Sequence, residues 1–159
     1  MLIILEGCDC SGKTTLAKKL QFITGAKIIH CTTDTPNDFW FFSNIIQMSE
    51  TQDIITDRFC YGQFVYQNPE ERKLTSEELC SLELNLINRD AKLVYVRANP
   101  EDIQKRLNSR NEELFTNPEE VQSRFEKIFD NSLLDVKVYD TSNSNTCCKT
   151  WEEYKNDRF

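Results

Sequence analysis

The sequence has little glycine, proline or histidine and no long apolar run. Four glycines and four prolines among 159 residues exclude a collagen-like or low-complexity chain. No segment approaches the roughly 20 consecutive apolar residues that span a bilayer. The one histidine, His30, cannot complete a zinc site with cysteines that lack paired metal-ligand spacing. We therefore expect a folded chain with no membrane span and no structural zinc.

Cationic residues are also in deficit. Lys and Arg number 19 against 26 Asp and Glu, which gives a net charge of −7. Duplex nucleic acid and anionic membranes both attract clustered cations, so neither is an expected partner. The first residues, MLIILEG, have no basic region and no small-residue cleavage site, and the seven cysteines are odd in number. We expect reduced thiols and a cytoplasmic location.

Short apolar runs alternate with longer segments of helical periodicity. This alternation predicts one α/β domain over 1–159, with a parallel sheet covered by helices on both faces. The expected strands are 2–5, 27–31, 53–56, 92–96 and 136–139. The expected helices are 11–24, 37–48, 58–67, 75–88, 100–110 and 117–133, with a last one carrying Trp151 and Tyr154.

The segment between the first strand and the first helix fits the phosphate-loop pattern G-x-x-x-x-G-K-[ST] without a mismatch. In such a loop, backbone N–H groups and the helix N-terminus surround phosphate oxygens. The lysine adds charge at the β- and γ-phosphates, and the hydroxyl can ligate Mg²⁺. The predicted phosphate site consists of Gly7, Cys8, Asp9, Cys10, Ser11, Gly12, Lys13, Thr14 and Thr15.

A phosphate loop does not by itself identify the reaction. The N-K-x-D and D-x-x-G motifs of GTPases are absent from the sequence. A small-molecule kinase needs an acceptor site beside the loop, and Asp57 and Arg58 follow the third strand, at the sheet edge where α/β proteins bind ligands. Asp57, with Thr14, could hold Mg²⁺. Arg58 could clasp an acceptor phosphate.

Two segments together resemble the thymidylate kinase family. They are 5–15, LEGCDCSGKTT, and 57–67, DRFCYGQFVYQ, which is similar to the family signature D-R-[YFH]-x-x-S-x-x-A-Y-Q. Residues 105–110 resemble the basic start of the family's lid, and 138–142 resemble its last strand and adenine-side loop. The order of these blocks matches along most of the chain. The resemblance implies a three-layer P-loop kinase fold with a five-stranded parallel sheet of order 2-3-1-4-5.

The resemblance also implies phosphoryl transfer from ATP to a deoxynucleoside monophosphate, with Mg²⁺. Lys13, Asp9, Arg58, Arg106 and Arg110 would be catalytic, with the two last arginines closing a lid at about 106–118 over the donor phosphates. Asp9 would approach the sugar 3′-hydroxyl. Family members commonly dimerise, so a homodimer is expected. The expected acceptor-binding residues are Asp9, Phe39, Arg58, Gly62, Tyr66 and Gln67.

The departures from the family leave the substrate open. The chain is shorter than typical members, and the segment 32–37 replaces the family's R-E-P-G, so that one acceptor-phosphate arginine is missing. Gly62 and Val65 replace a serine and an alanine near the expected base, which leaves thymine, uracil and a modified pyrimidine as candidates. A compact enzyme of this kind would suit a phage or virus.

Three rival functions stay open. The first is a deoxynucleoside kinase, for which Glu6 would be the carboxylate base that acts on a 5′-hydroxyl. The second, phosphorylation of a modified base within DNA, conflicts with the net charge. The third is a nucleotide-binding protein without turnover. The aromatic cluster 39–42 is expected to supply core or a dimer face, with one ring, Phe39, as a candidate for the acceptor pocket.

Overall fold

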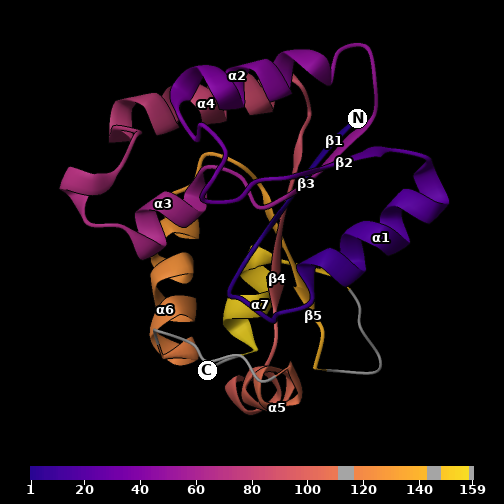
Figure 1. The fold of residues 1–159 in the computed structure, drawn as a ribbon, viewed down its shortest axis with the longest axis vertical. Coiled ribbons are helices and arrows are strands. Elements are labelled where there is room, and N and C mark those ends of the chain that lie inside the picture. The colour runs from indigo at the N-terminus through magenta and orange to yellow at the C-terminus, as the bar shows by residue number, and fades with distance from the viewer. Residues whose placement is uncertain (111–116, 143–147, 158–159) are drawn as a thin grey trace.

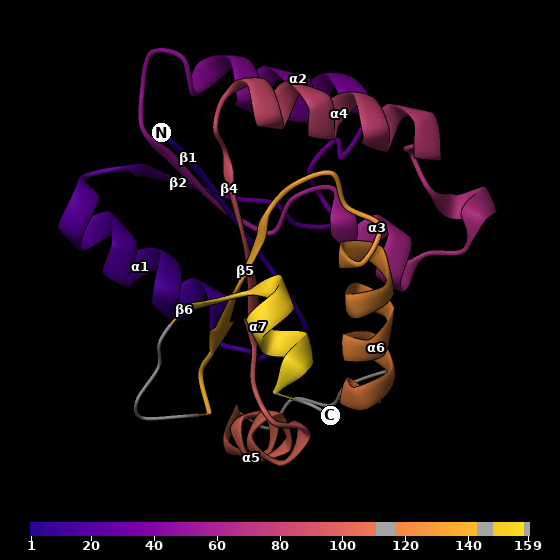
Figure 2. The same cartoon turned by 180° about the vertical axis from the view of Figure 1, so that it is seen from behind.

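The chain folds around one sheet with helices on both faces (Figure 1; from behind, Figure 2). The computed structural model describes residues 1–110, 117–142 and 148–157. The strands are β1 (Leu2–Glu6), β2 (Lys27–His30), β3 (Ile54–Asp57), β4 (Lys92–Arg97), β5 (Val136–Asp140) and β6 (Cys148–Thr150). The helices are α1 (Lys13–Thr24), α2 (Phe39–Met48), α3 (Tyr61–Tyr66), α4 (Ser76–Asn88), α5 (Pro100–Arg110), α6 (Pro118–Phe129) and α7 (Trp151–Asn156), with a 3₁₀ turn η1 (Pro69–Glu71).

The sheet order is β2-β3-β1-β4-β5-β6. The first five strands are parallel, in the predicted order 2-3-1-4-5, and that prediction is confirmed. The prediction of five strands is wrong, because β6 adds an antiparallel sixth strand beside β5. β6 has three residues, none of them fully buried, so it shows no apolar run that a sequence pattern could reveal.

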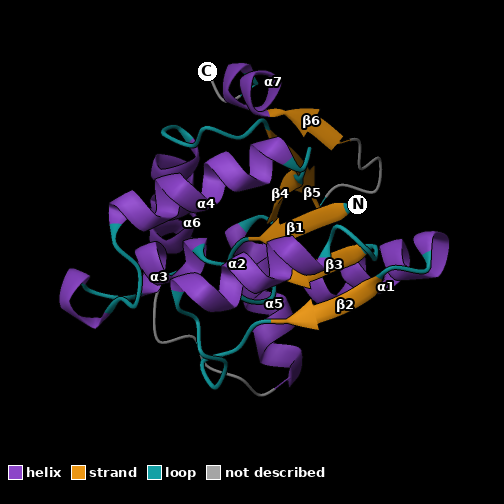
Figure 3. Cartoon of the chain, turned by 90° about the horizontal axis from the view of Figure 1, so that it is seen from above, coloured by secondary structure: helices purple, strands orange, loops and turns teal. Residues whose placement is uncertain are grey.

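Two apolar clusters lie on opposite faces of the sheet. Alternate side chains of a strand point to opposite faces, so Ile54 packs with the larger cluster and Ile55 with the smaller one. The smaller cluster includes Leu16 and Ala17 of α1. The larger one takes in α2, α3, α4, α5, α6 and α7. Figure 3 shows the chain from above, with the arrows of β1, β3 and β2 lying side by side among the helices.

Local backbone chemistry sets where several helices begin and end. Gly25, with φ of 72°, ends α1 and donates its N–H to the Gln21 carbonyl at 2.8 Å. Thr75 precedes α4 and caps it through a capping box with Glu78. α3 begins at Tyr61, three residues later than expected, because Arg58 takes a left-handed φ of 70°. None of the described helices is both long and apolar enough to cross a membrane.

Candidate active site

The phosphate loop between β1 and α1 depends on two glycines. Gly7 has φ of 144°, and a Cβ at this position would lie 2.1 Å from the carbonyl oxygen of Val96. Gly12 has φ of 103°, and its Cβ would meet the methyl group of Thr141 at 3.1 Å. The loop therefore passes close to the ends of β4 and β5, and this contact fixes it at the carboxyl edge of the sheet.

Lys13 is buried inside the loop. Its ammonium group donates to the carbonyl oxygens of Gly7 at 2.8 Å and of Cys8 at 2.7 Å. Burial lowers the pKa of Lys13 below its ordinary value, and the positive charge of Arg58 acts in the same direction. Phosphate oxygens beside this ammonium would offset both effects, which makes the loop interior a favourable place for an anion.

Asp57 lies buried at the end of β3, within reach of two donors. The Thr14 hydroxyl donates to its Oδ2 at 2.6 Å, and Nδ1 of His30 lies 3.0 Å from the same oxygen. The other oxygen, Oδ1, is buried and accepts no hydrogen bond within the described part of the chain. Carboxylate and hydroxyl oxygens are ligands that suit Mg²⁺, and an unpartnered carboxylate oxygen fits a cation or its water. The structure thus brings together both residues that the sequence suggested for the ion.

Arg58 is held in an unusual backbone conformation. Its φ of 70° is rare for a residue with a side chain, and its N–H donates to the Leu5 carbonyl at 2.9 Å. Its guanidinium forms an ion pair with the Asp9 carboxylate of the phosphate loop. Strained backbone of this kind persists where the surrounding structure imposes it, often at ligand sites. The result is a cation and a carboxylate side by side at the mouth of the loop.

Glu6 is the last residue of β1 and is fully buried. Its Oε1 accepts the N–H of Phe59 at 2.8 Å. Burial raises the pKa of this carboxyl to about 7, although the hydrogen bond from Phe59 and the charge of Lys13 both oppose the rise. With a pKa of about 7, the Glu6 carboxyl can be protonated or ionised near neutral pH, next to the phosphate loop.

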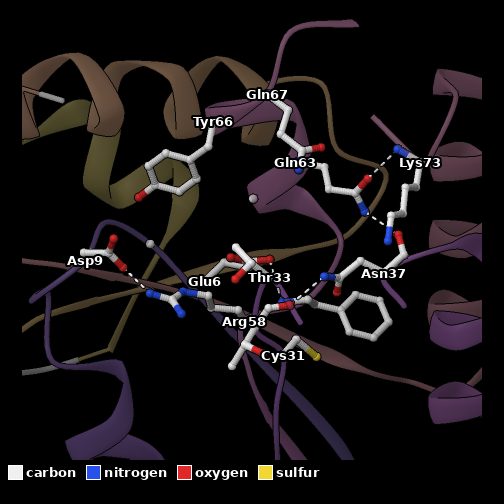
Figure 4. A pocket seen from close by; sticks show the side chains of 14 residues that line it. Glu6, Asp9, Cys31, Thr33, Asn37, Arg58, Gln63, Tyr66, Gln67 and Lys73 are labelled. Carbon is white, nitrogen blue, oxygen red and sulfur yellow. Dashed lines mark hydrogen bonds and ion pairs between the residues drawn. The ribbon is translucent and has the colours of Figure 1, made fainter. Parts of the chain in front are cut away.

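A cavity of about 300 Å³ opens beside these charged residues (Figure 4). Five of the six predicted acceptor residues line it, and Phe39 does not. Phe39 packs instead edge-on against Trp40 at the start of α2, and the aromatic rings that line the cavity are those of Phe59 and Tyr66. The sequence did not predict that Phe59, Asn37, Gln63 and Lys73 line the cavity. The lining comprises Glu6, Gly7, Asp9, Cys31, Thr32, Thr33, Asn37, Arg58, Phe59, Gly62, Gln63, Tyr66, Gln67 and Lys73.

The far wall of this cavity is held by the side-chain amide of Gln63. Its Nε2 donates to the Asn37 carbonyl at 2.8 Å, and its Oε1 accepts the N–H of Lys73 at 2.9 Å. Lys73 in turn donates its ammonium to the Pro36 carbonyl at 2.7 Å. Three segments distant in sequence are thereby joined around the cavity (Figure 4). Gln63 lies inside the segment 57–67 that the sequence singled out, but no spacing in the sequence links it to Asn37 or Lys73.

A second cavity, of about 310 Å³, lies on the other side of the loop. Arg106 of α5 lines it but is already engaged, since it donates to the Cys10 carbonyl at 3.0 Å and to the hydroxyl and carbonyl of Thr141 at 2.9 and 3.1 Å. Nη1 of Arg110 lies 3.7 Å from the Cys10 sulfur. Both arginines thus adjoin the loop, while 111–116 of the predicted lid lie outside the described residues. The lining residues are Cys10, Gly12, Thr15, Leu16, Lys19, Arg106, Arg110, Tyr139 and Thr141.

The sheet order, the phosphate loop and the cavities on either side of it define the fold of P-loop nucleotide kinases. No protein-family model matches the chain. The chain is 30% identical over 150 residues to the SPbeta prophage-derived uncharacterized protein YorR of Bacillus subtilis strain 168, and the match covers 88% of each sequence. It belongs to the family of that protein.

Solved structures agree with this assignment. The crystal structure of B. subtilis YorR in complex with phosphorylated GDP superposes with a TM-score of 0.78 at 27% identity, covering 99% of this chain and 93% of that one. Deoxyadenosine kinase from M. mycoides with bound dCTP shares 15% identity, with a TM-score of 0.54 and coverage of 89% and 90%. Thymidylate kinase from Ehrlichia chaffeensis shares 16%, with a TM-score of 0.51 and coverage of 99% and 96%. At these lower identities the likeness shows the fold alone.

Proposed function

We propose that the protein transfers a phosphoryl group from ATP to a deoxynucleoside monophosphate. One observation carries the proposal: the cavity that contains Arg58 begins at Gly7 and Asp9 of the phosphate loop. A phosphate held by Arg58 would therefore lie next to the place where the loop holds the donor phosphates. Phosphoryl transfer depends mainly on positioning and charge, so this adjacency is the property such an enzyme needs.

The roles follow from the contacts. Lys13 would place its charge against the β- and γ-phosphates once these displace the Gly7 and Cys8 carbonyls from its ammonium. Asp9 would release Arg58 to the acceptor phosphate and turn to the sugar hydroxyl. Arg106 and Arg110 would border the donor nucleotide in the second cavity.

Mg²⁺ is proposed as the cofactor, held at Thr14 and Asp57. The bound ion would neutralise charge on the phosphate oxygens. The acceptor base is proposed to be thymine, uracil or a modified pyrimidine, in the cavity bounded by Gly62, Tyr66 and Gln67. The phosphorylated GDP in the related YorR crystal structure supports nucleotide use by this family.

A second candidate is a deoxynucleoside kinase, and Glu6 favours it. A general base works best with a pKa near the operating pH, and the pKa of Glu6 is raised to about 7 at the wall of the acceptor cavity. In a nucleoside kinase Glu6 would take the proton of the 5′-hydroxyl, and Arg58 would lie at the 5′ end of the substrate. A monophosphate acceptor presents an ionised oxygen and needs no such base.

An ADP-release assay with Mg·ATP tests both candidates. The acceptors are dTMP, dUMP, 5-hydroxymethyl-dUMP, dCMP, dGMP and dAMP, each paired with its nucleoside, with a control lacking acceptor. Glu6→Gln keeps the oxygen that accepts the Phe59 N–H but removes the base. We expect the unsubstituted protein to phosphorylate a pyrimidine monophosphate, and Glu6→Gln to keep most of this activity. Turnover on nucleosides alone, lost in Glu6→Gln, would replace the first proposal by the second, and silence with ATP still bound would favour a non-catalytic binder.

The homodimer stays a prediction. Trp40 on α2 is 72% exposed, and Leu84 and Ile87 on the adjoining helix α4 are also exposed, so this apolar face is the proposed contact. Sedimentation of the protein and of Trp40→Glu would test it, because a dimer that this substitution leaves intact must use another surface.

A further inference from the structure

His30 contacts the proposed ion site, although the proposed mechanism gives it no role. Strand pairing sets His30 of β2 directly opposite Asp57 of β3. Paired residues of adjacent strands point to the same face, so the two side chains are brought together by the register itself. Nδ1 of His30 lies 3.0 Å from Oδ2 of Asp57. The sequence alone assigns His30 no role and does not reveal this contact.

The orientation of the Asp57 carboxylate rests on few contacts. Its Oδ2 accepts a hydrogen bond from the Thr14 hydroxyl and lies 3.0 Å from Nδ1 of His30, while Oδ1 accepts no hydrogen bond from any described residue. An ionised carboxylate only accepts hydrogen bonds, so Nδ1 pairs with it when this nitrogen carries a proton. Without His30, Thr14 alone would hold the carboxylate, and Thr14 is itself a proposed ligand.

We propose that His30 is a positioning residue, which fixes the Asp57 carboxylate beside Thr14 for the divalent cation that accompanies the nucleotide. The proposal rests on the proposed function insofar as it assumes a metal–nucleotide complex at the phosphate loop. His30 lines neither cavity, so it acts through Asp57 and not on the substrate. A residue that contacts a metal ligand but not the metal orients that ligand, and its loss typically weakens metal binding about 10- to 100-fold.

Two substitutions separate this role from a structural one. His30→Leu removes the donor and keeps the bulk. His30→Asn retains an amide nitrogen close to where Nδ1 lies. The His30 side chain is 47% exposed, so neither change should unfold the protein. Lys27→Met, at the other end of β2 and also exposed to solvent, is the matched control for changes on this edge strand.

The measurement is Mn²⁺ binding in the presence of ADP, followed by the electron paramagnetic resonance signal of free Mn²⁺, together with ADP binding in the absence of metal. We expect His30→Leu to weaken Mn²⁺ binding about 10-fold, His30→Asn to restore it to within about threefold, and metal-free ADP binding to stay unchanged. Lys27→Met should match the unsubstituted protein.

Two results would overturn the proposal: Mn²⁺ binding by His30→Leu that equals that of the unsubstituted protein, or His30→Asn as weak as His30→Leu. The assay contains no acceptor and no turnover. A protein that binds Mn²⁺ with ADP in this His30-dependent way but phosphorylates nothing would therefore contradict the proposed function and support the role of His30. A protein that binds no Mn²⁺ with ADP would contradict both.

Discussion

The phosphate loop and the acceptor cavity adjoin each other but are built in different ways. The loop is held through hydrogen bonds to its backbone carbonyls. Lys13 donates to two of them, Arg106 to a third and the Thr141 hydroxyl to a fourth. The cavity is walled by side chains from segments far apart in sequence, joined by Gln63. Backbone contacts tolerate changes of sequence, whereas side-chain walls do not. We therefore expect the loop side to carry the chemistry common to the fold, and the cavity side to determine what this protein binds.

The largest expected effect tests the loop side. Lys13→Ala removes the buried ammonium, and we expect kcat to fall roughly a thousandfold, because preorganised charge in a water-poor site contributes that much to a transition state. Lys18→Ala, an exposed lysine on the same helix, is the control and should leave kcat unchanged. Steady-state kinetics with saturating ATP measures both. Equal kcat values for the two variants would remove the loop from the mechanism.

The next effect lies at the boundary between the two regions and concerns stability. Between its ordinary pKa of 4.5 and its raised pKa of about 7, folded Glu6 keeps a proton that the unfolded chain has lost. The folded state binds more protons there, so its stability falls as pH rises through this window and levels off above it. As the pH rises from 5 to 8, we expect the free energy of unfolding of Glu6→Gln to increase by about 3 kcal/mol relative to that of the unsubstituted protein. Urea unfolding across that range tests this, and parallel stability curves for the two proteins would contradict it.

On the cavity side, Arg58→Ala should raise the acceptor KM about 10- to 100-fold and leave the ATP KM nearly unchanged, because a charge-assisted hydrogen bond is lost on one side only. The variant keeps a side chain at φ of 70°, so Arg58→Gly controls for backbone strain. An equal rise in both KM values would place Arg58 outside the acceptor site.

A smaller effect is expected where β5 meets the loop. The Thr141 hydroxyl donates to the Ser11 carbonyl at 2.6 Å and accepts from Arg106 at 2.9 Å. Thr141→Val removes both contacts and should raise the ATP KM about tenfold with no change in the acceptor KM, since a lost buried hydrogen bond costs about 1 kcal/mol or more. Thr141→Ser, which keeps the hydroxyl, should stay close to the unsubstituted protein. If Thr141→Ser is impaired and Thr141→Val is not, the methyl contact with Gly12 matters and the hydroxyl does not.

The same contrast explains what the sequence could predict. The loop motif and the alternation of strands and helices are local patterns, and they predict a parallel sheet and the place of Lys13, Thr14 and Asp57. The sheet order is implied by the resemblance to thymidylate kinases. The cavity depends on contacts across long sequence separations. Nothing in the spacing of Gln63 shows that it joins Asn37 to Lys73, or which ring of an aromatic cluster turns inward. The contact of His30 with Asp57 depends on strand register, which an apolar run does not define.

The smallest effect tests how tightly the cavity is built. Gly62 lies within α3, and a Cβ there would meet only the Tyr66 ring at 3.9 Å. Gly62→Ala should therefore stabilise the protein by about 0.5–1 kcal/mol through helix propensity. Because Gly62 also lines the cavity, the acceptor KM should rise by no more than about threefold if the base does not pack directly against it. Thermal unfolding and acceptor kinetics on the same variant separate the two effects. A gain in stability with a much larger loss of acceptor affinity would place the base against Gly62, the one glycine of α3 in the cavity wall.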